Sequence, residues 1–457
     1  MLPPRLREIL NRPWLWTSMV YACGIALRIL YTLRIQRPES LIYSDMSLYL
    51  GRARRMAAGQ PLMPYDVSQA LGYPAFLAFL NPHGNSLSRA VAAQLVVSCL
   101  LPVAVGLLGW VAFGRRTGLL AVVFASLYFP FIDYGALFLA EIHFIFWLAL
   151  AFAGFLSARR ARRRGLAIAA ALGGGFAISV AASFKALALP AAFVYFVADG
   201  IATAFAVGAR GAWWSWLARL RPWVLRGTLV VVGALPVLAV MSRACTRATN
   251  GRFCITGKEM GSDLLLGHYG RIADIEWKRD SDDQYSFGSP SAELRHYDTH
   301  ARVPFSITDG PANRKEAFQW IGRHPGEAIV LSIDHVYDTF FGSSMWPNYN
   351  GRSWPVGNLS QYVFIALLFV PTLLAFATVA RRGLRATVTS QTALAMAPIA
   401  ALTITVMIAT GEVRYRIPFD TFFIAIACAY LAGELTRIDD GTTPVIPSGT
   451  GAAPARS

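Results

Sequence analysis

The sequence is poor in charge. Of its 457 residues, only 15% are Asp, Glu, Lys or Arg, against about 25% in average soluble domains. Hydrophobic residues make up 55%, and apolar runs of about 20 residues, the length that spans a bilayer, recur along the chain. This pattern excludes a soluble globular domain. The runs do not alternate apolar with polar residues, as a closed β-barrel requires. We predict an all-α polytopic membrane protein.

Cysteine is also scarce. Five cysteines are too few for a disulfide framework. Three of them, Cys23, Cys99 and Cys428, lie in apolar runs, where buried free thiols are expected. The other two, Cys245 and Cys254, follow an apolar run on what we place as the outer side. A disulfide between them requires an oxidising compartment, and the alternative is two free thiols.

Negative charge is in deficit, and the net charge is +16. The basic residues do not form one nucleic-acid-binding face, so we predict no nucleic-acid partner. They occur in short clusters between apolar runs, at 115–116, 159–160, 162–164 and 381–385. Such clusters mark the cytoplasmic turns of membrane proteins. The first apolar run is too long for the core of a signal peptide, so we expect it to be retained as the first helix.

The runs and the clusters together predict about ten transmembrane helices with both termini inside. The predicted spans are 14–35, 87–112, 117–135, 141–158, 165–183, 186–207, 224–242, 359–380, 388–410 and 417–435. Residues 1–242 then form an N-terminal transmembrane catalytic module with an external loop at 36–86. Residues 243–358 form one large external loop, 359–436 the C-terminal helices, and 437–457 a disordered cytoplasmic tail.

Amphipathic stretches in both external loops predict helices lying on the outer membrane face. In the large loop, the sequence His324-Pro325-Gly326 predicts a break between two such helices. Many secondary transporters carry an internal repeat, and this chain shows none. A transporter or lipid flippase would also need polar groups at mid-bilayer, whereas most charges here lie at helix ends.

Acidic residues are concentrated in the outer turns. Asp45 follows the first helix and could accept the proton of an attacking hydroxyl or amine, although Ser44 or Asp45 could equally cap a helix. Asp133 and Glu141 flank the turn between the third and fourth helices. Acids beside transmembrane helices are usually functional, and the alternative for Glu141 is interaction with the helix dipole.

Basic residues in the outer turns call for an explanation, because the positive-inside rule disfavours them there. Arg414, Tyr415 and Arg416 precede the last helix, and Lys185 lies between the fifth and sixth. The arginine fork suits phosphate, and the alternative is internal pairing with Glu412 or contact with lipid headgroups. Acids on these turns could hold a divalent metal, but their spacing is not diagnostic. The sequence therefore leaves metal binding open and identifies no cofactor.

Three segments resemble one family. YSDMSLYLGRARRMAAGQPL followed by GYPAFLAF, then FIDYGALFLAEIHF, and finally GEVRYRIPF resemble external loops of the GT-C membrane glycosyltransferases, in the branch of the protein O-mannosyltransferases and the bacterial aminoarabinose transferase. The family's acidic pair is reduced here to Ser44-Asp45, its double proline to Tyr73-Pro74, and the loop 243–358 has no counterpart.

The resemblance implies a polyprenyl-phosphate-linked sugar donor and transfer to a lipid, glycan or protein acceptor, on the external face of what we expect to be a bacterial inner membrane. It implies Asp45 as the base or acceptor-orienting acid, and Glu141 or Asp133 as a second acid at the acceptor or at a metal. It places Lys185, Arg414 and Arg416 near the donor phosphate. A single displacement would invert the anomeric centre.

Three further readings stay open, of which the transporter or lipid flippase is the first. An O-antigen ligase or polymerase would also use a polyprenyl donor and would concentrate its arginines and histidines in the large loop. Arg295, His296, His300 and Arg302 do lie there. A scaffold protein is the third reading, and it predicts that replacing Asp45 leaves function intact.

Overall fold

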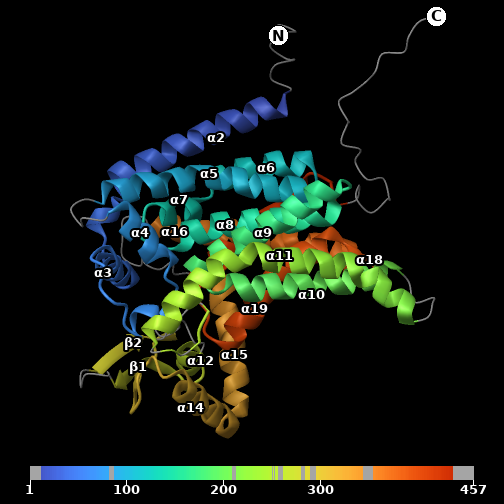
Figure 1. Ribbon diagram of the computed structural model, residues 1–457. Coiled ribbons are helices and arrows are strands. Elements are labelled where there is room, and N and C mark those ends of the chain that lie inside the picture. The colour runs from blue at the N-terminus through green and yellow to red at the C-terminus, as the bar shows by residue number, and fades with distance from the viewer. Residues whose placement is uncertain are drawn as a thin grey trace, which may run out of the picture.

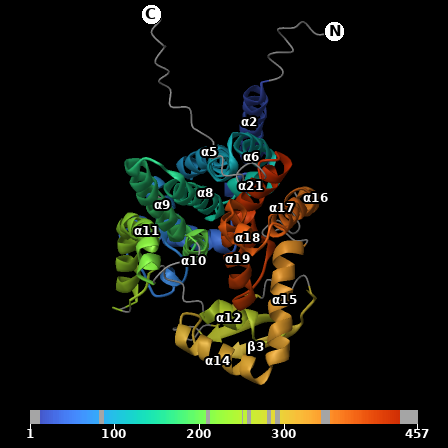
Figure 2. The same cartoon turned by 90° about the vertical axis from the view of Figure 1, so that its right-hand side faces the viewer.

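The structure is a computed structural model, and it describes residues 12–81, 87–207, 213–249, 251, 253–255, 261–278, 284–288, 295–342 and 354–435. The predicted disordered tail, 437–457, lies outside the described residues. Helices dominate the described chain, and the two cartoon views show them as one bundle with a smaller lobe beside it (Figures 1 and 2).

The bundle is built from the following elements in chain order: α2 (Pro13–Leu30) with a π-helical turn (Tyr31–Ile35), α5 (Ser88–Phe113), α6 (Arg115–Leu127), α7 (Phe129–Gly135), α8 (Glu141–Arg160), α9 (Arg164–Phe184), α10 (Ala188–Val207), α11 (Trp213–Ala248), α16 (Trp354–Phe364) with a π-helical turn (Ile365–Phe369), α17 (Val370–Ala380), α18 (Leu384–Thr389), α19 (Gln391–Ile408), α20 (Val413–Arg416) with a 3₁₀ turn (Ile417–Phe419), and α21 (Asp420–Leu431).

Within the described residues, eight helices are long and apolar enough to cross a membrane, and the bent pair α6–α7 would make a ninth. This agrees with the predicted polytopic architecture. The predicted tenth span, 417–435, differs: its helix α21 has only 12 residues. The cause lies in the sequence, since the charged residues Arg416 and Asp420 interrupt the apolar pattern where α20 passes through the 3₁₀ turn into α21.

The core of the bundle surrounds α8, and 72% of the apolar stretch of this helix is buried. This helix packs along α5 and α9, while α21 packs against α5, α6 and α17. The basic turns after α5, α8 and α17 lie at one end of the bundle, on the right in Figure 1, and α3 (Asp45–Ala57) and α4 (Gly72–Leu80) lie at the other. The bundle therefore has a basic end and an opposite end that carries the segments predicted to be external.

Residues 261–341 form a separate lobe. It contains α12 (Gly261–Gly267), β1 (Ile272–Lys278), β2 (Gln284–Gly288), β3 (Thr299–Val303), α14 (Gly310–Arg323) and α15 (Pro325–Phe341). The strand order is β2-β1-β3, with β1 antiparallel to β2 and parallel to β3. Leu265, Ile275, Trp277 and Ala317 centre its own small core. The predicted break before Pro325 is confirmed, whereas the sheet was not predicted.

The lobe meets the bundle at two glycines. Gly267, at the end of α12, lies against the backbone carbonyl of Ala409, and Gly411 lies against the carbonyl of His335 on α15. A Cβ atom at either glycine would overlap a backbone oxygen, so a side chain there would force the segments apart. The joint therefore depends on the absence of side chains.

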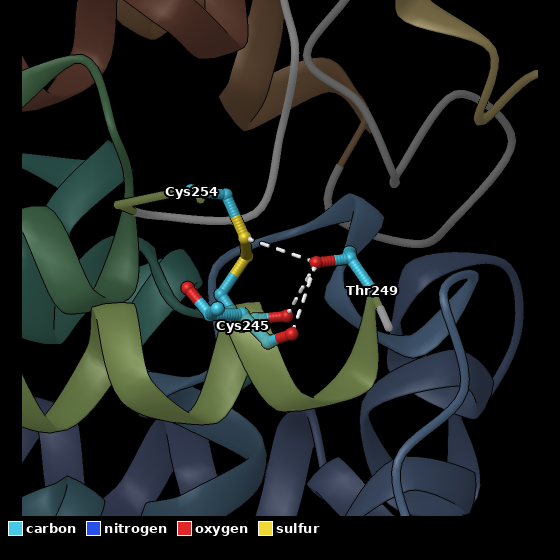
Figure 3. The surroundings of a disulfide bond; sticks show 4 residues. Cys245, Thr249 and Cys254 are labelled. Carbon is cyan, nitrogen blue, oxygen red and sulfur yellow. Dashed lines mark hydrogen bonds between the residues drawn. A yellow bond between two sulfur atoms is a disulfide. The ribbon is translucent and has the colours of Figure 1, made fainter. Parts of the chain in front are cut away.

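A disulfide links Cys245 at the end of α11 to Cys254, with 5.8 Å between their Cα atoms; of the two alternatives that the sequence left open, a bridge and two free thiols, the structure has the bridge. Figure 3 shows the bond beside Thr249, whose hydroxyl donates to the Cys245 carbonyl at 3.0 Å. Cys245 and Cys254 pack with Val67 and Leu71 of the first external segment. The bridge thus fastens the end of α11 beside the loop that leads into α4.

Candidate functional site

Asp45 is the first residue of α3, and its side chain is buried. Ser44 before it has φ 48°, a strained backbone conformation for a residue with a side chain, and its side chain makes no capping hydrogen bond. The Asp45 carboxylate instead receives the Arg414 guanidinium at 2.9 Å and the Gln69 amide at 3.3 Å. The local fold directs this acid to another segment of the chain.

Arg414 joins two acids. Besides Asp45, it contacts the carboxylate of Glu141, the fully buried first residue of α8, through Nε. The same Glu141 oxygen accepts a hydrogen bond from Lys185 Nζ at 2.8 Å. Lys185 lies in the turn between α9 and α10, so α3, α8, this turn and α20 each contribute one charge. We call Asp45, Glu141, Lys185, Glu412 and Arg414 the Arg414 cluster.

Burial and the neighbouring charges shift the pKa values of residues in the Arg414 cluster. Burial raises the pKa of Asp45, but Arg414, Lys185 and the Gln69 hydrogen bond together outweigh burial and bring this pKa below its usual value. Burial lowers the pKa of Lys185 despite the neighbouring Glu141. Burial also raises the pKa of Glu412, to about 7. The Lys185 ammonium lies 5.9 Å from the centre of the Tyr415 ring. These shifts are the kind found at functional sites.

Two carboxylate oxygens in this cluster lack a hydrogen-bond donor among the described residues. Glu141 Oε2 and Glu412 Oε1 are buried and have no hydrogen-bond partner among the described residues. The same holds for Thr410 Oγ1 nearby in sequence. A buried polar atom without a partner costs roughly 1–3 kcal/mol, and native structures contain few of them. The cluster is therefore built to receive something further.

The other predicted site residues have partners elsewhere. Asp133 accepts a hydrogen bond from the Tyr31 hydroxyl at 2.6 Å. Arg416 forms an ion pair with Asp420 at 3.1 Å and donates to Gln361 at 2.7 Å. Its guanidinium lies over a phenylalanine ring, and Tyr128 donates to Asp420 at 2.6 Å. We call Tyr128, Gln361, Arg416 and Asp420 the Arg416 cluster; all four side chains are buried.

Metal binding was left open by the sequence. Among the described residues, no three or more His, Cys, Asp or Glu side chains are grouped so that they could hold a metal ion. In the Arg414 cluster, Asp45 and Glu141 face cations rather than each other.

Three of the four arginines and histidines that an O-antigen ligase would use, Arg295, His300 and Arg302, are paired within the lobe. Arg295 pairs with Asp338 at 2.9 Å, His300 with Asp274 at 2.6 Å, and Arg302 with an acid on β1 at 2.8 Å. These charges serve the lobe's own structure.

Two residues of the site were missed or undervalued from the sequence. Gln69 links two residues of α3, because its Oε1 accepts from Arg52 Nη1 at 2.8 Å while its amide donates to Asp45. Asp66 in turn pairs with Arg55. The basic residues of α3 therefore hold the loop that supports Asp45. Glu412 was considered only as an arginine partner, although a glutamate two residues before an outer arginine was a usable signal.

No protein-family model and no curated protein matches this sequence. Solved structures do match. The oligosaccharyltransferase AglB of Archaeoglobus fulgidus, in its apo form, aligns at TM-score 0.51 and 11% identity, over 90% of this chain and 50% of that one. Its complex with an inhibitory peptide and a dolichol-phosphate aligns at TM-score 0.50 and 12% identity, over 92% and 50%. The fold is of the GT-C type.

The GT-C fold confirms the resemblance noted in the external loops and the predicted architecture. This chain spans about half the length of the AglB chain, so the likeness concerns the arrangement of helices. Within the GT-C bundle, the Arg414 cluster lies at the end that carries α3 and α4, opposite the basic turns (Figure 1).

Proposed function

We propose that this integral membrane protein is a glycosyltransferase. It moves a sugar from a polyprenyl-phosphate-linked donor to a lipid, glycan or protein acceptor. The observation that carries the proposal is the Arg414 cluster: two cations and three acids gathered at one end of the bundle, all buried except the partly exposed Lys185. Its support comes from the shared GT-C fold, one example of which binds a dolichol-phosphate.

The donor phosphate interacts with Arg414 and Lys185. A guanidinium and an ammonium stabilise the charge that grows on a departing phosphate. Glu141 holds both cations in place, and Tyr415 shields Lys185 from one side. The prenyl tail of such a donor lies in lipid while its phosphate sits at headgroup level, which matches a charged site at the end of an apolar bundle.

Asp45 orients the acceptor and Arg414 together. Its carboxylate remains charged near neutral pH, because Arg414 keeps its pKa low. Asp133 and Arg416 are not assigned to donor or acceptor, since each has a buried partner of its own. The acceptor attacks the anomeric carbon while the bond to phosphate breaks, and this single displacement inverts the configuration.

The reaction takes place on the external face, which for a bacterial inner membrane is the periplasm. Two observations support this orientation. The basic turns lie at the opposite end of the bundle and mark the cytoplasmic side. The Cys245–Cys254 disulfide lies beside the first external segment, and disulfides persist in oxidising compartments.

The test is sugar transfer from a labelled polyprenyl-phosphate sugar in membranes that hold matched amounts of each variant. We expect Asp45→Asn to lower transfer at least about 10²-fold, a typical loss for a misplaced catalytic group, with donor binding retained. Arg302→Gln is the matched control, because its ion pair is exposed and lies in the lobe.

Each contrary outcome has its own meaning. If wild-type membranes transfer no more sugar than membranes without the chain, the glycosyltransferase proposal is wrong and a transport assay is the next step. If Asp45→Asn transfers as well as wild type, the enzyme stands but its site lies elsewhere.

A further inference from the structure

We infer that Glu412 is the group that takes the proton from the acceptor. This inference rests on the proposed glycosyl transfer and adds to it the identity of the base. Glu412 lies between the end of α19 and the start of α20, directly after Gly411, whose backbone is fixed against α15. The contact of Gly411 with α15 and the start of α20 therefore fix the backbone on either side of Glu412.

The two other carboxylates in the Arg414 cluster are already neutralised. Asp45 is paired with Arg414, and Glu141 with both Arg414 and Lys185. A carboxylate held by cations is a weak proton acceptor, because accepting a proton would cost it those interactions. Glu412 forms no ion pair among the described residues, and its Oε1 is buried without a hydrogen-bond donor. The acceptor's O–H or N–H is the donor that this oxygen lacks.

The surroundings of Glu412 leave it a stronger base than an ordinary carboxylate. Burial raises its pKa to about 7, against the opposing pull of Arg414 and Lys185 and with the help of Asp45 and Glu141. Two tyrosines also interact with it electrostatically, Tyr134 on α7 and Tyr415 on α20. From α15, the backbone carbonyl of His335 faces the preceding residue. A base works best when its pKa lies near the operating pH.

The step balances as follows. The acceptor's oxygen or nitrogen lone pair forms a bond to the anomeric carbon. The bond between that carbon and the phosphate oxygen breaks, and its electron pair leaves with polyprenyl phosphate. The acceptor's proton moves to Glu412 Oε1 and is later released to water. No oxidant, reductant or covalent sugar–enzyme bond is needed.

The experiment is a pH profile of transfer with the full-length protein in membranes, for wild type, Glu412→Gln, Glu412→Ala and Glu412→Asp. Wild type should lose activity on the acid side with a midpoint near 7, so transfer at pH 6 should be about tenfold below its plateau. Glu412→Gln should transfer 10²- to 10⁴-fold less, a typical contribution of a general base, and should lose this acid limb.

Two readouts separate a base from a structural role. Glu412→Asp keeps a carboxylate and should recover part of the activity, with its acid limb shifted. Added formate should raise transfer by Glu412→Ala but not by wild type. Gel filtration and binding of the labelled donor show that each variant is folded.

The inference is overturned if Glu412→Gln, folded and binding donor, transfers within about threefold of wild type with the same acid limb. In that case the proposed function stands and the base is another group. If wild type transfers no sugar at any pH, the proposed function fails, and the inference falls with it.

Discussion

Arg414 and Arg416 are two residues apart, yet they lie in buried clusters of different kinds. In the Arg416 cluster the charged groups have partners within the cluster. Arg416 pairs with Asp420, donates to Gln361 and lies over a phenylalanine ring, and Tyr128 donates to Asp420. The Arg414 cluster leaves Glu141 Oε2 and Glu412 Oε1 without partners among the described residues. One turn of chain thus supplies one arginine to the fold and one to the site.

The difference teaches how buried charge can be assigned a role. A buried ion pair whose hydrogen bonds are all made is weak evidence for function, because it already offsets much of its own desolvation. A cluster that gathers charges from separate segments and leaves buried oxygens without a donor among the described residues is stronger evidence, because buried polar atoms normally have a partner. The following changes test that distinction.

The largest effect should come from breaking the complete cluster. Arg416→Met leaves Asp420 buried without its cation, and losing one partner of a buried pair costs about 3–5 kcal/mol. We expect a large fall in the folded fraction, measured by gel filtration and thermal unfolding in detergent. The double variant Arg416→Met, Asp420→Leu should recover much of the loss. An unchanged melting temperature for the single variant would contradict the structural role.

Arg414→Lys should separate activity from stability. It keeps the charge but loses the fork that spans Asp45 and Glu141, a contact that lysine cannot reproduce. We expect transfer to fall about 10²-fold, a typical loss for one stabilising donor, with a melting temperature close to that of wild type. The matched control is Arg416→Lys, which should lose stability instead. Equal behaviour of the two variants would remove the distinction between the clusters.

Loss of the disulfide should affect the Arg414 cluster more than the Arg416 cluster. Cys245→Ser opens a link between residues nine apart in sequence, worth about 2–3 kcal/mol in the chain-entropy account. Because the bridge packs on Val67 and Leu71, we expect reduced transfer at elevated temperature, measured with and without a thiol reductant. Cys99→Ser is the control. A wild-type protein insensitive to the reductant would count against this bracing role.

The smallest effect should come from Gln69→Ala. Asp45 would lose one hydrogen bond from an uncharged amide to its carboxylate, and a bond to a charged group is worth about 1.5 kcal/mol at the lower end, so transfer should fall about tenfold. Gln60→Ala, at an exposed position, is the control. A loss as large as that of Asp45→Asn would mean that Gln69 touches the substrate itself.

Much of the fold could be predicted from the sequence, because lipid demands long apolar helices and basic clusters mark their cytoplasmic ends. The break before Pro325 and the turn at Lys185 follow from local chemistry alone. The sheet of the lobe could not be predicted, since β1 and β3 are short and pair across more than 20 intervening residues. Their pairing depends on tertiary contacts that leave no local pattern.

The site was predicted in part. Asp45, Glu141, Lys185 and Arg414 do meet, because the turns that hold them share one end of the bundle. The separation of Arg416 was missed, although positions two apart in a helical turn point in nearly opposite directions. The role of Gln69 could not be foreseen, because a glutamine in a loop carries no sign of its distant partner.

The glycines at the joint between lobe and bundle bear on how a chain of this fold can vary. Gly267 and Gly411 bring backbones together where no side chain fits, whereas the lobe keeps a small core of its own. We therefore expect the lobe's strands and surface to tolerate change, provided that the two glycines stay and α15 keeps its contacts with α19 and α20. Exchange of lobes between relatives should succeed when the cut sites lie outside these glycines and fail when they divide them.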